Sequence, residues 1–243
     1  MTSAHPWSGQ VWFGEDWACF EGLCGDARAH HHLAAQVVVG LSGSVTIEGP
    51  CGAVVGEAVL IAPRTLHAIV PSDRIVRVVY LQSFGGLAHS WGIPTRPAAP
   101  YALPARWADR LRGSDPGRSL AAASAACEPR RLDPRLAAAL QDLRGLTEVD
   151  GDLGDIARRV GLSPARLRAL TRAELGAPLA HWRAWLRLER AIGALRRGDP
   201  LAAAAVQAGF SDQAHLSRTM RRFFGITPQT ASRVVARPPR PAT

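Results

Sequence analysis

The chain contains no lysine, and all 29 of its basic residues are arginine. Cysteine is scarce as well: the four cysteines form no C-x-x-C pair and no framework of the kind that staples small secreted domains, so we expect reduced thiols. No run approaches the ~18 apolar residues of a membrane span, and the N-terminal residues lack the basic start and apolar core of a signal peptide. These absences predict a soluble, cytoplasmic protein without a membrane segment.

The distribution of charge is uneven along the 243 residues. Up to residue 93, four arginines stand against seven acidic residues, and in 94–149 nine stand against six. From residue 150 onward sixteen stand against seven, so this segment alone carries a surplus equal to the net charge of +9. A basic surplus of this kind favours binding to nucleic acid phosphates.

The basic segment contains two imperfect copies of a helix-turn-helix pattern. In the first copy Asp152 is a candidate N-cap, and a turn is expected at Gly161, where a residue without Cβ suits the left-handed conformation. Ser163 is placed to cap the next helix, with Pro164 at its first position. Gly209 stands at the corresponding turn of the second copy, 48 residues later.

The second helix of each copy divides into an apolar face and a polar face at helical spacing. We expect Leu167 and Leu170 to point inward in the first. In the second, which we expect Ser211 to open, the inward residues are Leu216, Met220 and Phe223. The polar faces hold the predicted DNA contacts, namely Ala165, Arg168, Ala169, Arg172, Gln213, Ala214, His215, Ser217, Arg218, Arg221 and Arg222, together with Ser163 and Ser211 at the leading ends.

These residues suit two different roles at a DNA surface. Arginine, glutamine and histidine read base edges in the major groove, which we assign to Arg168, Arg172, Gln213, His215 and Arg218. The serines with Arg221 and Arg222 are assigned to phosphates. For one copy alone, a basic solvated helix face is an equally good interpretation, and the presence of two copies favours DNA.

A single helix is predicted between the two copies, over residues 178–197, with apolar residues at helical intervals. Twenty helical residues span about 30 Å. Successive major grooves on one face of B-DNA recur every ~34 Å. One chain is therefore predicted to place two recognition helices in adjacent grooves of one duplex.

Residues 209–228, GFSDQAHLSRTMRRFFGITP, closely resemble a motif of the AraC family of bacterial transcription regulators. Ile156-Ala157 and Gly161-Leu162-Ser163 resemble the family in the first copy, and Arg187-Leu188-Glu189 resembles its linking helix. Thr171 and Ala204 depart from it, because the family usually has larger apolar residues there. The resemblance implies a promoter-binding regulator, often an activator, with RNA polymerase as a partner and a small-molecule effector bound to the N-terminal domain.

The N-terminal part shows a β pattern from Val11 to Leu81. Short runs rich in β-branched residues are separated by Gly, Pro, Ser or Asp, which is typical of a sandwich or small barrel. This pattern and the helix-turn-helix units predict an α+β fold class with two domains: an all-β barrel, which the histidine motifs below liken to a cupin, and an all-α domain with two helix-turn-helix motifs joined by a linker helix.

Residues 25–36, GDARAHHHLAAQ, and 63–67, PRTLH, resemble the two motifs that hold a metal in cupin barrels. We expect His30 and His32 to alternate along a strand and share one face, joined by His67 and by Gln36, which replaces the usual acid. Three interpretations stay open. The four residues bind a divalent metal, they line a metal-free pocket for a polar ligand, or the imidazoles are merely hydrogen-bonded.

Three helical pieces are predicted after a proline-rich boundary, at about 104–112, 119–127 and 133–144. Leu136, Leu140 and Leu143 form a narrow apolar stripe on the last piece, which packs either on the barrel or on its copy in a homodimer.

The predicted organisation is a cupin-like sensor domain at 1–93, a helical connector at 94–148, a DNA-binding domain at 149–235 and a disordered tail at 236–243. The predicted function is sequence-specific transcription regulation controlled by a small ligand or a metal. The alternative is a metal-dependent cupin enzyme with an appended DNA-binding module. No general acid or nucleophile stands out beside the histidines, so we assign no catalytic residue and predict no enzyme activity.

Overall fold

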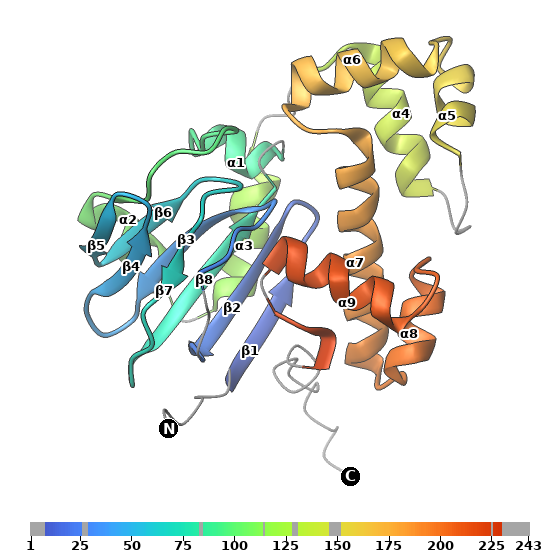
Figure 1. The fold of residues 1–243 in the computed structure, drawn as a ribbon. Helices are drawn as coiled ribbons and strands as arrows, with labels where there is room; N and C mark the ends of the chain where they lie inside the picture. The colour runs from blue at the N-terminus through green and yellow to red at the C-terminus, as the bar shows by residue number, and fades with distance from the viewer. Residues whose placement is uncertain are drawn as a thin grey trace.

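The computed structural model describes residues 8–25, 29–82, 85–113, 115–127, 131–145, 152–224 and 226–229. The predicted disordered tail at 236–243 lies outside these residues. Figure 1 shows a β-rich N-terminal region beside a C-terminal region made of helices, which confirms the α+β class. None of the described helices is long and apolar enough to span a membrane.

The strands form two antiparallel sheets. The six-stranded sheet has the order β1 (Ser8–Phe13), β2 (Trp17–Leu23), β8 (Ile75–Leu81), β3 (Ala35–Gly40), β6 (Ala58–Ile61) and β9 (Tyr101–Ala102). The three-stranded sheet has the order β5 (Gly52–Gly56), β4 (Val45–Gly49) and β7 (Ala68–Ile69). All six residues of β3 are buried, since both faces of the larger sheet are covered, and this explains the continuous valine run at its centre.

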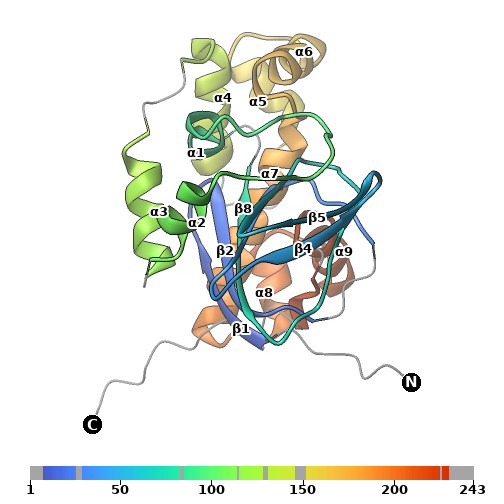
Figure 2. The same ribbon diagram turned by 90° about the vertical axis from the view of Figure 1, so that its left-hand side faces the viewer.

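One face of the larger sheet is covered by the short helices α1 (Gly86–Ser90), α2 (Ala105–Leu111) and α3 (Pro116–Ala125). Its other face packs on the smaller sheet and on C-terminal helices, in one continuous apolar cluster that includes Val38, Val78 and Phe224. Figure 2 shows α3 at the left of the strands and α7, α8 and α9 behind them.

The expected closed cupin-like barrel is not confirmed. The described strands make two separate sheets, and helices cover the open side of the larger one. The sheet also extends past the predicted domain boundary at residue 93, because β9 pairs with β6 through Val59 and Ala102. The first two of the three predicted helical pieces correspond to α2 and α3.

The C-terminal helices are α4 (Pro134–Gly145), α5 (Leu153–Arg159), α6 (Pro164–Leu175), α7 (Leu179–Arg197), α8 (Leu201–Gln207) and α9 (Gln213–Phe224). The long helix α7 joins the two helix-turn-helix units α5–α6 and α8–α9, as the sequence predicts (Figure 1). Trp182 packs in the apolar cluster of the first unit, whereas Trp185 and Ile192 pack in that of the second.

The predicted turns and first caps are confirmed. The Asp152 carboxylate accepts a hydrogen bond from the Gly154 backbone N–H at 2.9 Å. The Ser163 hydroxyl accepts one from the Arg166 backbone N–H at 3.2 Å. Gly161 and Gly209 have φ angles of +70° and +87°, in the left-handed region that glycine adopts without a steric penalty.

The predicted partners of the stripe on α4 are wrong. Leu136, Leu140 and Leu143 are buried against α5, α6 and the start of α7, within the same chain. The stripe therefore completes the core of the first helix-turn-helix unit, and neither the β sheet nor a second chain is its partner. The three leucines supply apolar bulk that Thr171 lacks, and Thr171 is 0% exposed in the same region. The Thr171 hydroxyl donates to the Leu167 carbonyl at 2.6 Å.

Candidate nucleic-acid interface and histidine cluster

Helix α6 presents the polar face that the sequence predicts. Ala165, Arg168, Ala169 and Arg172 are exposed, while Leu167, Thr171 and Leu175 are buried. Leu170, predicted to point inward, is only half-buried at the edge of the cluster. Ser163 lies exposed at the leading end, as expected for a phosphate contact.

Helix α9 is divided in the same way. Leu216, Met220 and Phe223 are buried together with Phe224. The predicted DNA contacts Gln213, Ala214, Arg218, Arg221 and Arg222 are exposed, and His215 and Ser217 are half-buried. The two recognition helices thus each present one polar side to solvent.

The prediction that Ser211 opens α9 is wrong by one residue. Asp212, and not Ser211, is the N-cap, because its carboxylate accepts from the His215 backbone N–H at 2.6 Å and its carbonyl accepts from Leu216 at 3.2 Å. The hydrogen bond from the His215 backbone is the main cause that lowers the pKa of Asp212. Sequence reasoning overlooked Asp212, although aspartate is as good an N-cap as serine.

Ser211 instead forms side-chain hydrogen bonds with Asp212 and His215. Its hydroxyl lies 3.1 Å from an Asp212 carboxylate oxygen and 3.2 Å from His215 Nδ1. The His215 ring also packs edge-on against Phe210, with 5.2 Å between ring centroids. His215 is therefore oriented before any partner arrives, which reduces the conformational entropy that a contact would cost.

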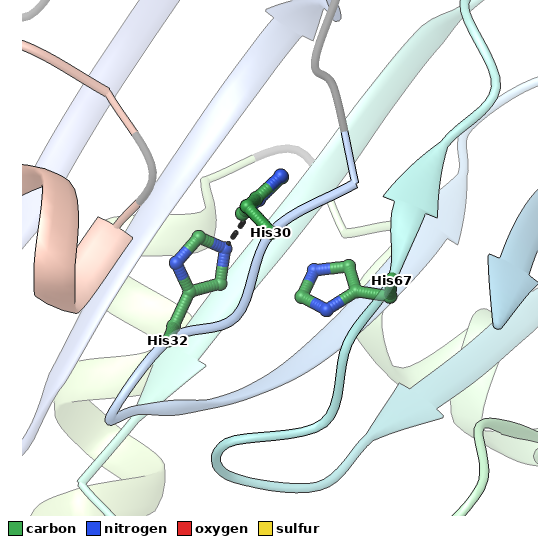
Figure 3. Close-up of side chains that lie close together, drawn as sticks. All are labelled: His30, His32 and His67. Atoms are coloured by element: carbon green, nitrogen blue, oxygen red, sulfur yellow. Dashed lines mark hydrogen bonds between the residues drawn. The ribbon is translucent and has the colours of Figure 1, made fainter. Parts of the chain in front are cut away.

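The three predicted histidines lie together at the edge of the β region (Figure 3). One potential ligand atom from each of His30, His32 and His67 lies within 4.8 Å of the other two. The Nε2 atoms of His30 and His32 are 2.8 Å apart, and His67 Nδ1 is 2.8 Å from the Thr65 carbonyl.

The expected local structure of these histidines is wrong. His30 and His32 are not part of a regular strand; His30 forms an isolated bridge with His67, with backbone hydrogen bonds of 2.9 Å and 2.8 Å. A long-range backbone pair, rather than strand alternation, therefore brings the cluster together.

His32 and His67 are held in the neutral form that binds metals. Burial is the main cause that lowers the pKa of His67 to about 4 and that of His32 well below 6.5. His67 Nε2 and His32 Nδ1 are buried and have no hydrogen-bond partner among the described residues. His67 Nε2, on a buried neutral imidazole, offers an unused lone pair that fits a divalent ion such as Zn²⁺.

Gln36, the fourth predicted ligand, lies on β3 and is 1% exposed. Its side-chain oxygen makes no hydrogen bond within the part of the chain that the structure describes. Gln36 pairs in register with Ile61 and Tyr80, and the Tyr80 ring lies 6.1 Å from that of His32. Its role as a ligand stays a prediction.

A cavity of about 690 Å³ lies between strands β1 and β2, helix α3 and helix α7, where the sequence does not predict one. Its walls include Trp12 and Trp17 of the N-terminal strands, Ser124 of α3, and Trp182 and Arg196 of α7. A volume of this size is within the range of small-molecule pockets. The long-range packing that forms it leaves no signal in the local sequence pattern.

The C-terminal helical region is similar to known proteins. A family model described as a helix-turn-helix domain matches residues 156–233. The arabinose operon regulatory protein of Escherichia coli (strain K12) is 32% identical over 99 residues, or 40% of this chain. The chain spans 34% of that protein's length.

Two solved structures extend the comparison. A transcriptional regulator from Chromobacterium violaceum, described as having an AraC-type DNA-binding domain, is 32% identical, covers 41% of this chain and 89% of its own, and has a TM-score of 0.38. ToxT from Vibrio cholerae strain SCE256, with unsaturated fatty acid bound, is 11% identical, covers 97% of this chain and 98% of its own, and has a TM-score of 0.53. The latter likeness concerns the fold alone, and it includes both regions of the chain.

Proposed function

Because the C-terminal region of this chain is a helix-turn-helix domain of the AraC type, we propose that the protein is a sequence-specific DNA-binding transcription regulator. The observation that carries the proposal is the pair of exposed polar faces on α6 and α9, one in each helix-turn-helix unit. Helix α7, with 19 residues, separates the two units by about 28 Å along its axis. This separation is close to the ~34 Å repeat of the major groove.

The polar side chains of the two helix-turn-helix units have two roles in DNA binding. Arg168 and Arg172 on α6, with Gln213, His215 and Arg218 on α9, contact base edges and give specificity. Ser163, Ser211, Arg221 and Arg222 contact phosphates and set the register. We propose activation of transcription, with RNA polymerase as the partner, as the output.

A small effector or a divalent metal controls this binding in our proposal. The three-histidine cluster supports metal binding, because the imidazoles of His32 and His67 are neutral and the buried Nε2 of His67 lacks a hydrogen bond among the described residues. The fatty acid bound to ToxT supports a small organic effector for a chain of this fold. Either effector must bind two states of the chain with different affinity, since otherwise it shifts no equilibrium.

Selection of binding sites from a random DNA pool, followed by affinity measurements, tests the DNA-binding proposal. We expect Arg218→Ala to weaken binding to the selected site by about 1 to 3 kcal/mol and to relax one base position. Arg222→Ala should weaken selected and scrambled DNA equally and reduce the salt dependence. Arg118→Ala, at an exposed arginine on α3, is the matched control and should leave affinity unchanged. Equal losses on selected and scrambled DNA for Arg218→Ala would reject base reading by this residue.

A further inference from the structure

The C-terminal end of α9 is held by residues of the β region. The last four carbonyls of a helix have no partner within that helix, and in α9 they belong to Arg221, Arg222, Phe223 and Phe224. The Arg222 carbonyl accepts from the Leu33 backbone N–H at 3.0 Å. Two more of these carbonyls also meet β-region groups.

The Phe224 carbonyl accepts from the Tyr80 hydroxyl at 3.2 Å. The Arg221 carbonyl lies beside the His32 imidazole and favours its charged form. The β region therefore acts as the C-terminal cap of the second recognition helix.

Aromatic packing fixes the same contact. Phe224 is 3% exposed, and its ring centroid lies 5.4 Å from that of Phe13, 5.1 Å from Tyr80 and 5.4 Å from Trp185. Phe13 and Tyr80 come from the β region, while Trp185 comes from α7. The end of α9 is thus enclosed by both parts of the chain.

The protonation of the ring nitrogens connects the histidine cluster to this helix cap. His67 Nδ1 is bonded to the Thr65 carbonyl, so this nitrogen carries the proton and Nε2 is free to ligate. His30 and His32 share a hydrogen bond between their Nε2 atoms. If both Nε2 atoms ligate an ion, the His32 proton must reside on Nδ1.

His32 Nδ1 points away from the other two histidines, toward the end of α9 at the left of Figure 3. A ligating imidazole usually donates its second N–H to a carbonyl or carboxylate. The Arg221 carbonyl lies beside this ring, and it belongs to the recognition helix.

We propose that His30, His32 and His67, when they hold a divalent ion, tighten the β-region cap on α9 and so raise the affinity of this helix for DNA. The proposal rests on the proposed function for its effect on DNA, whereas the cap itself is a property of the chain. Occupancy of the site fixes a donor on His32 for the Arg221 carbonyl and restrains α9 before DNA binds. One added hydrogen bond corresponds to about a fivefold change in an equilibrium constant.

Hydrogen exchange of the full chain, with and without Zn²⁺, tests the cap. We expect Zn²⁺ to slow exchange about fivefold at the Leu33 amide and in the last turn of α9. His67→Gln removes a ligand without touching α9 and should abolish this effect. Tyr80→Phe removes one cap donor and should speed exchange at the end of α9 while Zn²⁺ still binds. Tyr101→Phe, at the other tyrosine of the chain, is the matched control and should behave as wild type.

DNA affinity gives the second readout. Zn²⁺ should raise affinity for the selected site about fivefold, and the site should raise Zn²⁺ affinity by the same factor, since coupling is reciprocal. Zn²⁺ binding that leaves exchange in α9 unchanged would overturn the proposed tightening of the cap, and so would a failure of Zn²⁺ to bind. Zn²⁺-slowed exchange in a chain that selects no DNA sequence would instead overturn the proposed function and leave the cap standing.

Discussion

Acid should destabilise the folded chain through His67. This side chain is 2% exposed, and burial is the main cause that lowers its pKa to about 4. The folded chain keeps His67 neutral, while the unfolded chain binds a proton below pH 6.5. Its contribution is therefore complete above pH 6.5 and is lost as the pH falls through 6.5 toward 4.

The size of the effect follows from the pKa. A decrease from 6.5 to about 4 corresponds to about 3 kcal/mol in total, of which about 2 kcal/mol is lost by pH 5. The pKa of His32 is also lowered, chiefly by burial, so its contribution is likewise lost as the pH falls below 6.5 and adds to the change. Three neutral imidazoles are also what an ion requires, so acid should weaken metal binding as well.

Urea unfolding at pH 7.5 and pH 5, in the presence of a chelator, measures this loss. Between the two pH values, His67→Gln should lose about 2 kcal/mol less stability than wild type. His89→Gln changes an exposed histidine on α1 and should lose as much as wild type. An equal loss in wild type and His67→Gln would show that His67 is not buried in its neutral form.

Two further predictions concern glycine and cysteine. Gly161→Ala should destabilise the chain by about 1 kcal/mol in thermal unfolding, because the φ angle of Gly161 is +70°. Gly193→Ala should instead stabilise the chain by up to about 1 kcal/mol, because a Cβ added at this position of α7 meets only Arg197, at 3.7 Å. The opposite order of stabilities would refute the backbone conformation assigned to these two glycines. Burial raises the pKa of Cys19 and Cys24 to about 12. Alkylation at pH 8 should therefore modify the exposed Cys51 and spare these two thiols. Rapid modification of Cys24 in the folded chain would contradict its burial.

The sequence predicts the helix-turn-helix units well, because their signals are local. The 3.6-residue period separates Leu216 and Met220 from Arg218, and the turns at Gly161 and Gly209 need a conformation that glycine favours. The one-residue error at the cap of α9 arises because Ser211 and Asp212 are equally good N-cap residues.

The remaining errors come from long-range packing. The leucine stripe on α4 has the same period whether it meets a sheet, a second chain or α5, and only the fold shows that α5 and α6 cover it. The bridge between His30 and His67, like the contact between Leu33 and Arg222, joins residues far apart in the sequence. No local pattern encodes such pairs, so strand alternation was the wrong explanation for a histidine cluster that does form.

In the proposed function, α6 and α9 of one chain enter adjacent major grooves of one duplex. Hydroxyl-radical footprinting and methylation interference on a selected site test it most directly. We expect protection of two segments about 10 base pairs apart on one face of the DNA, with Arg168→Ala weakening one and Arg218→Ala the other. A single protected segment that responds only to Arg218→Ala would contradict the claim.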